Sequence, residues 1–350
     1  LNDLDPSSDA SRKCLCELRT VCGTRAILPT SCMVSTDLLE IDSDPFALGG
    51  FDDVYRGTLN DSWVCIRRVR AYTEDASKKA IKRFCKEVVT WKTLRHPNVL
   101  PLMGVTMTEK RFVMMSEWME NGNINTFIKT HDDVNRLELL GDVTTGLIYM
   151  HDQGIVHGDL KGANILINRD GHACIADFSL LTVISNQQTF LSTCIGGGTI
   201  PWMSPELLDP ESFGLKKCRL TVESDCYALG MVIYEVLGGR APFAPSMIPV
   251  LKIISGERPQ KPQGAQGVWF ADSIWGVLEL CWKPQPNDRP SLSTVLRCLQ
   301  NVTRPPGPSY TGEDVETNAD DQSDVTTVSS SSTFPLVRLR FQTHLQTLVG

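Results

Sequence analysis

Three oxygen-bearing side chains and one lysine lie close together near the middle of the chain. Asp159, Lys161 and Asn164 occur in one short segment, and Asp177 follows thirteen residues after Asn164. A carboxylate can accept the proton of an attacking hydroxyl, amide and carboxylate oxygens suit Mg²⁺, and an ammonium group can neutralise a phosphoryl group. This pattern favours phosphoryl transfer, with Asp159, Lys161 and Asn164 as catalytic residues and Asn164 and Asp177 as metal ligands.

The order of the surrounding motifs strengthens this interpretation, because an Asp-x-x-x-x-Asn segment alone is equally typical of a capped turn. Asp159 ends His157-Gly158-Asp159, Asp177 begins Asp177-Phe178-Ser179, and Ser204-Pro205-Glu206 follows. This series resembles that of a eukaryotic protein kinase domain. Three tryptophan-containing positions, Trp91, Trp202-Met203 and Cys281-Trp282, make it most similar to the tyrosine-kinase-like group. In that resemblance Lys161 indicates serine/threonine specificity.

The resemblance implies ATP and Mg²⁺ as cofactors and a nucleotide cleft between two lobes. The implied nucleotide-binding residues are Ala47, Gly49 and Asp52 in the glycine-rich loop, Val54, Cys65 and Leu166 around the purine, Arg67 and Glu87 as the family's ion pair, and Glu117 and Met119 through their backbone. The function implied is an ATP- and Mg²⁺-dependent serine/threonine protein kinase that transfers the γ-phosphoryl group to protein hydroxyls.

The phosphate-binding half departs from the family pattern. Arg67 stands where the family has lysine, and a planar guanidinium places its charge differently from a compact ammonium. Ala47 and Asp52 replace two loop glycines, and Ser179 replaces the glycine that follows Asp177-Phe178. We therefore expect weakened activity. The alternative is a pseudokinase, which would use the same fold as an ATP-binding or scaffolding module.

Other residues resemble the family's structural anchors. Asp225 resembles the aspartate that holds the catalytic-loop backbone, and Thr199 resembles the threonine that contacts this loop. Arg289 resembles the arginine that pairs with Glu206. Gly158 replaces the arginine that grips a phosphorylated activation segment, so this route of control is expected to be absent. A small-molecule kinase of related fold is disfavoured, because the segment at Glu206 and Asp225 suits a peptide platform.

Hydrophobic periodicity predicts the elements that must position these residues. Strands are expected at Val64–Val69 and Arg111–Trp118, and helices at Glu74–Leu94, Asn135–His151 and Val222–Leu237. The first half is thus mostly strands with one helix, and the second half is mostly helical. Together with the resemblance, this predicts an α+β, two-lobed protein-kinase-like fold, with an N-lobe (40–117) of antiparallel sheet plus one helix and a mainly helical C-lobe (120–302).

The kinase-like domain is expected to cover residues 36–302 and to lie between two segments of different texture. Residues 1–35 form an N-terminal extension whose only periodic part, Lys13–Arg19, predicts a short helix. Residues 303–350 form a tail rich in acidic residues, Ser and Thr. Such a composition cannot bury a core, so this tail is expected to be disordered.

Composition narrows the classes of partner. The chain has 350 residues and a formal net charge of −7, which argues against nucleic acid as the main partner. No apolar stretch is long enough to span a bilayer. Cys14, Cys16, Cys22 and Cys32 match no standard zinc spacing, so we interpret the twelve cysteines as reduced thiols of a cytoplasmic protein. The expected partner is a protein substrate or a signalling protein, and the oligomeric state stays open.

Overall fold

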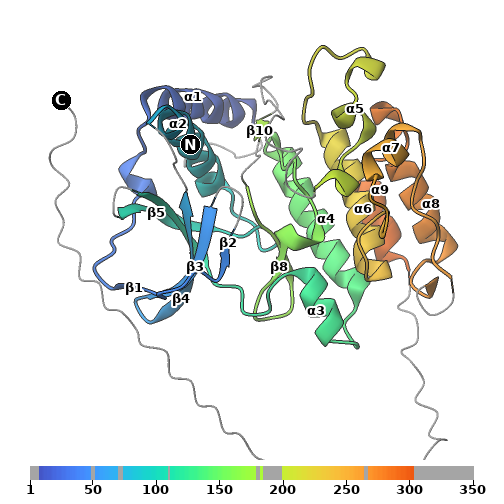
Figure 1. The fold of residues 1–350 in the computed structure, drawn as a ribbon, viewed down its shortest axis with the longest axis horizontal. Coiled ribbons are helices and arrows are strands. Elements are labelled where there is room, and N and C mark those ends of the chain that lie inside the picture. The colour runs from blue at the N-terminus through green and yellow to red at the C-terminus, as the bar shows by residue number, and fades with distance from the viewer. Residues whose placement is uncertain are drawn as a thin grey trace, which may run out of the picture.

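The structure is a computed structural model that describes residues 8–48, 52–69, 74–108, 111–178, 182–183, 199–263 and 267–302. These residues form a lobe built on a β-sheet and a second lobe built from helices (Figure 1). The expected α+β, two-lobed fold is confirmed. The predicted disordered tail at 303–350 lies outside the described residues.

Antiparallel strands form the N-lobe sheet in the order β1-β3-β4-β6-β5, and β2 pairs with β3 outside this path. The strands are β1 (Leu39–Ile41), β2 (Ala47–Leu48), β3 (Asp52–Leu59), β4 (Ser62–Val69), β5 (Leu102–Thr108) and β6 (Arg111–Glu117). The predicted strands at 64–69 and 111–118 are confirmed as β4 and β6, with ends that differ by one or two residues.

The register between β3 and β4 decides which side chains share a face of this sheet. Val54 lies opposite Arg67, and Cys65 is two residues before Arg67, so all three side chains share one face. Ile66, opposite Tyr55, lies on the other face and is fully buried there. Pairing of strands therefore brings three of the expected nucleotide-binding residues together.

Helix α2 (Glu74–Thr93) confirms the predicted helix at 74–94. Its residues Phe84, Val88 and Trp91 form a buried stripe at helical spacing. The short helix expected at 13–19 is longer than predicted: α1 runs from Asp9 to Arg25 and lies along α2 (Figure 1). Ser8 caps it, because its Oγ accepts a hydrogen bond from the backbone N–H of Ser11 at 3.1 Å.

Helices dominate the C-lobe, and α6 lies at its centre. They are α3 (Ile124–Thr130), α4 (Arg136–Asp152), α5 (Pro205–Leu208), α6 (Val222–Gly238), α7 (Pro249–Ile254), α8 (Asp272–Cys281) and α9 (Leu292–Gln300). Every residue of α6 from Ser224 to Leu237 is buried, which explains why this segment is apolar nearly all round. The predictions for α4 and α6 are confirmed.

Short elements connect these helices to the cleft. They are the strands β7 (Ile155–Val156), β8 (Ile165–Ile167), β9 (Ala173–Ile175) and β10 (Thr182–Val183), and the 3₁₀ turns η1 (Thr30–Cys32), η2 (Gly162–Asn164), η4 (Ile200–Trp202), η5 (Glu211–Phe213) and η7 (Pro286–Asp288). β8 and β9 form an antiparallel hairpin. This hairpin directly follows Asn164 and ends two residues before Asp177.

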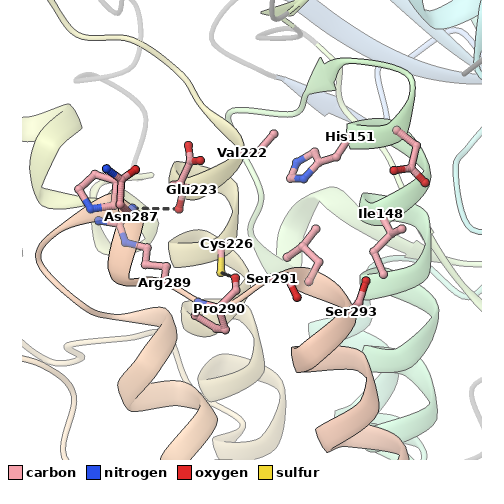
Figure 2. Close-up of a pocket in the computed structure, with 13 residues that line it drawn as sticks. Ile148, His151, Val222, Glu223, Cys226, Asn287, Arg289, Pro290, Ser291 and Ser293 are labelled. Carbon is pink, nitrogen blue, oxygen red and sulfur yellow. Dashed lines mark hydrogen bonds between the residues drawn. The ribbon is translucent and has the colours of Figure 1, made fainter. Parts of the chain in front are cut away.

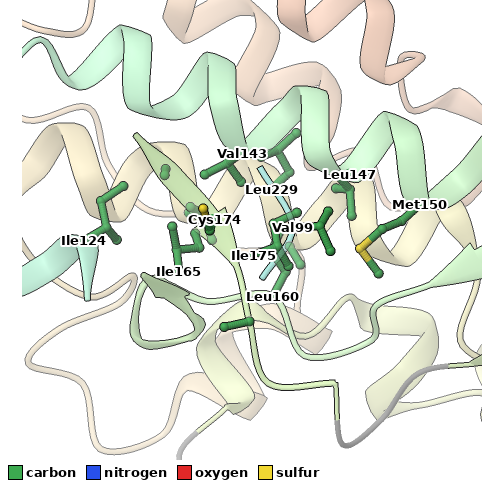
Figure 3. Close-up of a cluster of buried hydrophobic side chains, with 14 of the residues drawn as sticks. Val99, Ile124, Val143, Leu147, Met150, Leu160, Ile165, Cys174, Ile175 and Leu229 are labelled. Carbon is green, nitrogen blue, oxygen red and sulfur yellow. The ribbon is translucent and has the colours of Figure 1, made fainter. Parts of the chain in front are cut away.

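The core under the hairpin holds it in place. Figure 3 shows Val143 and Leu147 of α4 packed beside Ile165 and Ile175 of the hairpin and Leu229 of α6. All five side chains are completely buried. Because the hairpin is anchored on both helices, the residues at its two ends have little freedom to move apart.

Two negative findings concern the described part of the chain. No helix there is long and apolar enough to cross a membrane. No group of three or more His, Cys, Asp or Glu side chains in these ranges is arranged to hold a metal ion. Two of the four N-terminal cysteines, Cys22 and Cys32, are buried as small apolar residues in the N-lobe.

Candidate active site

The start of the loop after β7 is held by a buried carboxylate, that of Asp225. Asp225, in the first turn of α6, accepts hydrogen bonds from the backbone N–H groups of His157 at 2.8 Å and Gly158 at 2.9 Å. His151 of α4 contacts the same carboxylate, with Nε2 2.9 Å from Oδ2. Hydrogen bonds to a buried carboxylate are among the stronger ones, so the loop is fixed to the centre of the C-lobe.

His157 links this loop to the segment that carries Asp177. Its Nδ1 accepts from the backbone N–H of Asp159 at 3.2 Å, so Nε2 carries the ring proton and donates to Ala176 O at 3.0 Å. Phe178 is fully buried and packs on Trp91 of α2 at 5.0 Å between ring centroids. The segment around Asp177 is therefore tied to both lobes.

The two oxygens of Asp159 have different surroundings. Oδ2 accepts hydrogen bonds from Lys161 Nζ and from Asn164 Nδ2, both at 3.0 Å. Oδ1 is buried and has no hydrogen-bond partner within the described ranges. A buried carboxylate oxygen normally has a hydrogen-bond partner, so Oδ1 retains unused capacity to accept a hydrogen bond. Asp159 is thus oriented to accept one further hydrogen bond, such as that of a substrate hydroxyl.

Lys161 joins the catalytic loop to the loop before η4. Its Nζ donates to Thr199 Oγ1 at 2.8 Å as well as to Asp159. The predicted contact of Thr199 with the catalytic loop is confirmed. Because its ammonium is held by Asp159 Oδ2 and Thr199 Oγ1, Lys161 places a fixed positive charge beside the carboxylate of Asp159.

Arg67 contacts two carboxylates, one in its own lobe and one in the C-lobe. Its Nη1 lies 3.8 Å from Glu87 Oε1, and its Nη2 lies 3.3 Å from Asp177 Oδ1. The ion pair expected between Arg67 and Glu87 is present, and the fork of the guanidinium adds Asp177 to it. A point-like ammonium could not offer the two carboxylates two separate nitrogens.

The other residues expected to bind nucleotide lie on the N-lobe sheet, at the link between the lobes and on β8. Cys65 lies on the same sheet face as Arg67, and burial raises the pKa of its thiol, so it serves as an apolar wall. Met119 is buried at the link between the lobes, where Glu117 is exposed and its neighbour Ser116 is buried. Leu166 of β8 is half-buried on the opposite side.

A family model for protein tyrosine and serine/threonine kinases matches residues 43–299. The chain belongs to the protein kinase family. The resemblance drawn from the motifs is therefore confirmed. Membership implies ATP and a divalent metal ion as cofactors and a protein as substrate.

Curated relatives agree with this assignment. The kinase is 27% identical to the serine/threonine/tyrosine-protein kinase HT1 of Arabidopsis thaliana over 267 residues, 73% of this chain and 64% of that protein. It is 26% identical to the serine/threonine-protein kinase STY17 of the same plant over 301 residues, 81% of this chain and 50% of that protein. It is 28% identical to the cytokinesis protein sepH of Emericella nidulans over 259 residues, 73% of this chain and 18% of that protein. The chain spans less than two thirds of the length of each of these relatives.

The donor atoms at the cleft fit a divalent metal ion. Asn164 Nδ2 donates to the backbone oxygen of Asp159 at 2.8 Å and to Oδ2, which leaves the amide oxygen as its coordinating atom. Asp177 is 37% exposed at its side chain and has a left-handed φ of 58°. The backbone N–H of Ala176 donates to Asn164 O at 2.8 Å, so the two ligand-bearing segments are adjacent. Two oxygen donors of this kind suit a hard cation.

The glycine-rich loop of the kinase is described only at its ends. Ala47 is exposed on β2 opposite Val54 of β3. Gly49 and the side chain of Asp52 lie outside the described residues, so their predicted contact with the phosphates stays a prediction. Ser179 also falls outside the described ranges.

The structure explains why glycine, and no residue with a side chain, occupies position 158. Its φ is +81°, and a Cβ atom there would lie 2.5 Å from Leu220 Cδ1. A residue with a side chain would be strained and would also displace Leu220. Glycine at this position is therefore required by the close packing of Leu220 against the loop.

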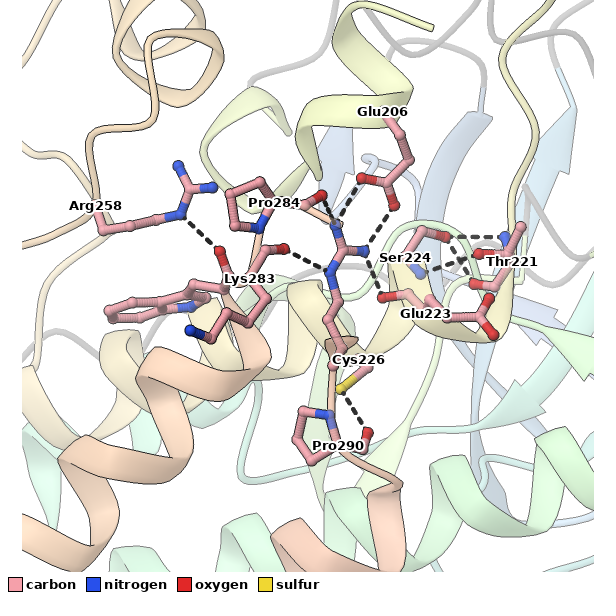
Figure 4. Close-up of polar contacts among 11 residues, drawn as sticks. Glu206, Thr221, Glu223, Ser224, Cys226, Arg258, Lys283, Pro284 and Pro290 are labelled. Atoms are coloured by element: carbon pink, nitrogen blue, oxygen red, sulfur yellow. Dashed lines mark hydrogen bonds and ion pairs between the residues drawn. The ribbon is translucent and has the colours of Figure 1, made fainter. Parts of the chain in front are cut away.

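A second anchor holds the loop at Glu206. Arg289 donates to both carboxylate oxygens of Glu206 at 2.7 Å, as predicted. Its other donors reach the backbone oxygens of Glu223 at 2.9 Å, Lys283 at 3.0 Å and Pro284 at 3.2 Å. Figure 4 shows these acceptors converging on one guanidinium. A buried bidentate pair with every neighbour satisfied holds this loop rigidly.

The motif search missed Glu235, although it stands within the apolar α6. It is 4% exposed and accepts hydrogen bonds from Gly162 N at 2.9 Å, Asn125 Nδ2 at 2.6 Å and Trp202 Nε1 at 2.8 Å. Burial raises the pKa of this carboxyl group. Glu235 therefore connects the catalytic loop, α3 and η4. A lone acid inside an apolar helix is the sequence signal that could have found it.

A cavity of about 440 Å³ lies on the C-lobe, apart from the catalytic residues. Figure 2 shows its wall, which includes Ile148 and His151 of α4, Glu223 of α6, and Arg289 and Ser293 before and in α9. His151 and Arg289 already have partners in Asp225 and Glu206. The cavity thus borders the anchors of the catalytic loop and contains none of the residues expected to bind nucleotide.

Proposed function

We propose that this kinase domain transfers the γ-phosphoryl group of ATP, with Mg²⁺, to serine or threonine hydroxyls of a protein. The observation that carries the proposal is the asymmetric environment of Asp159. One carboxylate oxygen is held by Lys161 and Asn164, and the other is buried with no hydrogen-bond partner among the described residues. A carboxylate oxygen in this position is suited to accept the proton of a substrate hydroxyl.

In this proposal the hydroxyl oxygen forms a bond to the γ-phosphorus while the bond to the β,γ-bridging oxygen breaks. The hydroxyl proton moves to Asp159 Oδ1, and ADP leaves with the electron pair. Lys161 neutralises charge on the transferring group, because its ammonium is fixed by Asp159 and Thr199. Asn164 and Asp177 would hold Mg²⁺, which when bound supplies positive charge to the phosphates.

We expect the rate to be low for the family, because Arg67 divides its charge between Glu87 and Asp177. Loss or misplacement of one such electrostatic contact costs about 10²–10³ in rate at comparable sites. Nucleotide binding is expected to persist, because the apolar walls at Cys65 and Leu166 do not depend on this charge.

The test is phosphate transfer from labelled ATP to peptide libraries that contain Ser, Thr or Tyr as the only acceptor. We expect labelling of the Ser and Thr libraries by the wild type and none by Asp159→Asn. In parallel, a thermal shift with ATP is measured with Mg²⁺, with Mn²⁺ and without metal. A metal-dependent shift without transfer above the Asp159→Asn background would replace the proposal by an ATP-binding pseudokinase. No shift and no transfer would indicate a scaffold.

A further inference from the structure

Helix α1 precedes the part of the chain that matches the kinase family model, yet it is packed into the N-lobe. Its buried residues are Ser11, Leu15, Arg19, Cys22 and Gly23. These positions recur at helical spacing and therefore form a single face. This face lies on α2, the helix that carries Glu87 (Figure 1). The extension is thus in contact with the helix on which the Arg67–Glu87 pair depends.

Arg19 is the unusual member of this face. It is 7% exposed, and burial lowers the pKa of its guanidinium to about 10. Burying a charged side chain is unfavourable unless hydrogen bonds compensate for the lost hydration. Arg19 Nη1 donates to Thr90 Oγ1 of α2 at 2.7 Å. Simple packing of two helices would be served equally well by an apolar side chain of the same length.

Thr90 is positioned to pass this contact on to α2. It is fully buried, and its hydroxyl also donates to Lys86 O at 2.8 Å, one helical turn earlier. Glu87 follows Lys86 directly. The Thr90 hydroxyl therefore accepts a hydrogen bond from Arg19 of α1 and donates one to the backbone oxygen of Lys86, the residue before Glu87. Rotation or shift of α2 at this turn would break the hydrogen bond from Arg19.

Two further contacts determine where α1 sits. The side chain of Lys86 runs across Gly23, where a Cβ atom would lie 2.4 Å from Lys86 Cε. At the other end of α1, the side chain of Arg12 lies against Gly154, where a Cβ atom would be 2.9 Å from its Cδ. Gly154 directly precedes β7 and the catalytic loop. Helix α1 thus contacts α2 of the N-lobe and the turn before the catalytic loop of the C-lobe.

We propose that α1 is a built-in positioning element of this kinase, and that Arg19 is a positioning residue that holds α2 in the place where Glu87 meets Arg67. Arg19 does not touch the nucleotide site and acts through Thr90. The inference deepens the proposed function, because a fixed α2 sets the fraction of molecules with an assembled cleft. The inference also predicts how stably α2 is held, and this can be measured even if the protein transfers no phosphate.

The test compares two arginines of the same helix in the full chain. Arg19→Met removes the buried donor, and Arg25→Met removes an exposed arginine as matched control. Backbone hydrogen exchange is followed in α2 between residues 81 and 93 and, as a reference, in α9. A hydrogen bond to a charged group corresponds to about a tenfold or larger change in local opening. We expect this increase in α2 of Arg19→Met, none in α9, and none in Arg25→Met.

Nucleotide affinity supplies the second readout. If α2 leaves its position in part of the molecules, the apparent Kd for ATP rises in inverse proportion to the fraction that keeps the assembled site. It rises about threefold when this fraction falls to about one third. Arg19→Lys keeps a cationic donor and should restore most of the protection of α2. A merely structural role of Arg19 would change global stability and exchange in α9 and leave the Kd for ATP unaltered.

A variant pair on α2 keeps the inference testable if Arg19→Met does not fold. Thr90→Val removes the acceptor at nearly constant shape, and Thr90→Ser keeps it. Faster exchange of α2 and weaker ATP binding in Thr90→Val than in Thr90→Ser support the inference, and equal behaviour overturns it. If the wild type transfers no phosphate but these differences appear, the proposed function fails and the positioning role stands. If the wild type is active and neither pair differs, the positioning role fails alone.

Discussion

Arg67 and Asp177 form an ion pair across the cleft, with Nη2 of the guanidinium 3.3 Å from Oδ1 of the carboxylate. Asp177 is also one of the two residues expected to bind the metal ion. The same guanidinium lies 3.8 Å from Glu87 Oε1. Arg67 therefore competes for a ligand that a divalent cation requires, and this competition gives the substitution of lysine by arginine a physical consequence.

Arg67→Lys is expected to raise kcat/KM for phosphate transfer by about 10², because an ammonium pairs with Glu87 and frees Asp177. The apparent affinity for Mn²⁺ in the presence of ATP should rise in the same variant. Arg68→Lys is the control, since Arg68 lies over the ring of Tyr55 at 4.5 Å, away from Asp177. Steady-state kinetics measures kcat/KM, and a metal titration measures the apparent affinity for Mn²⁺. An unchanged or lower kcat/KM in Arg67→Lys would show that the arginine is not the cause of slow transfer.

Asp159→Asn is expected to lower kcat by about 10²–10⁴, the contribution typical of a general base. The affinity for ATP should stay the same, because this carboxylate contacts Lys161 and Asn164. Asp170→Asn, in the exposed turn of the β8–β9 hairpin, is the matched control and should behave like the wild type. The measurement is single-turnover transfer with ATP binding followed separately. Full transfer by Asp159→Asn would mean that another group accepts the proton.

Glu235 is expected to make the stability of the kinase depend on pH in a defined direction. Burial raises the pKa of its carboxyl group in the folded state above the ordinary value of 4.5. The folded state therefore holds the proton more tightly than the unfolded state, and the stability contributed by this group is complete below the ordinary pKa. It is lost as the pH rises through the raised pKa.

This pH dependence of stability is measured by denaturant unfolding of the wild type and of Glu235→Gln, at several pH values from about 4.5 upward. The free energy of unfolding should fall with pH more steeply in the wild type than in Glu235→Gln. Glu235→Ala should cost about 3 kcal/mol or more at every pH, because Gly162 N, Asn125 and Trp202 lose their acceptor. Parallel pH profiles of wild type and Glu235→Gln would contradict the assignment.

Gly158→Ala is expected to destabilise the kinase more than Gly171→Ala. Both glycines have a left-handed φ, +81° and +83°, but a Cβ at 158 meets Leu220 at 2.5 Å and a Cβ at 171 meets nothing within 4 Å. The difference in the free energy of unfolding between the two variants is therefore the cost of overpacking against Leu220, about 1–3 kcal/mol. Thermal or denaturant unfolding of the two variants measures it. Equal destabilisation would show that only the backbone angle matters at Gly158.

Local order along the chain predicted the position of the catalytic loop and the residues proposed as metal ligands. Asn164 and Asp177 flank a hairpin of two short strands, and Asp159 lies in the loop just before it. Because the antiparallel hairpin brings its two ends together, Asn164 and Asp177 become neighbours although they are thirteen residues apart in the sequence. The helices α2, α4 and α6 were equally readable, since each buries a stripe or a whole surface of apolar residues.

Contacts between distant segments were predictable only where the resemblance to the kinase family named them, as for Arg289 and Glu206. Gly162 and Glu235 are 73 residues apart, and Arg19 and Thr90 are 71 residues apart. No periodicity states which buried donor will meet which acceptor, and a lone charge in an apolar helix only indicates that some partner exists. Arg67 is intermediate: its strand was predictable, but its choice of Asp177 as a second partner depends on how the two lobes close on each other.

The sequence by itself therefore determined the family and the main helices and strands, and it supplied the hypothesis for the chemistry of the site. Only the tertiary structure decided which charges share a partner, why glycine occupies position 158, and that the N-terminal extension is packed on α2. The physical reason is that helices, strands and short loops follow from neighbouring residues. The position of one element on another follows instead from packing and from satisfying buried polar groups over the whole chain.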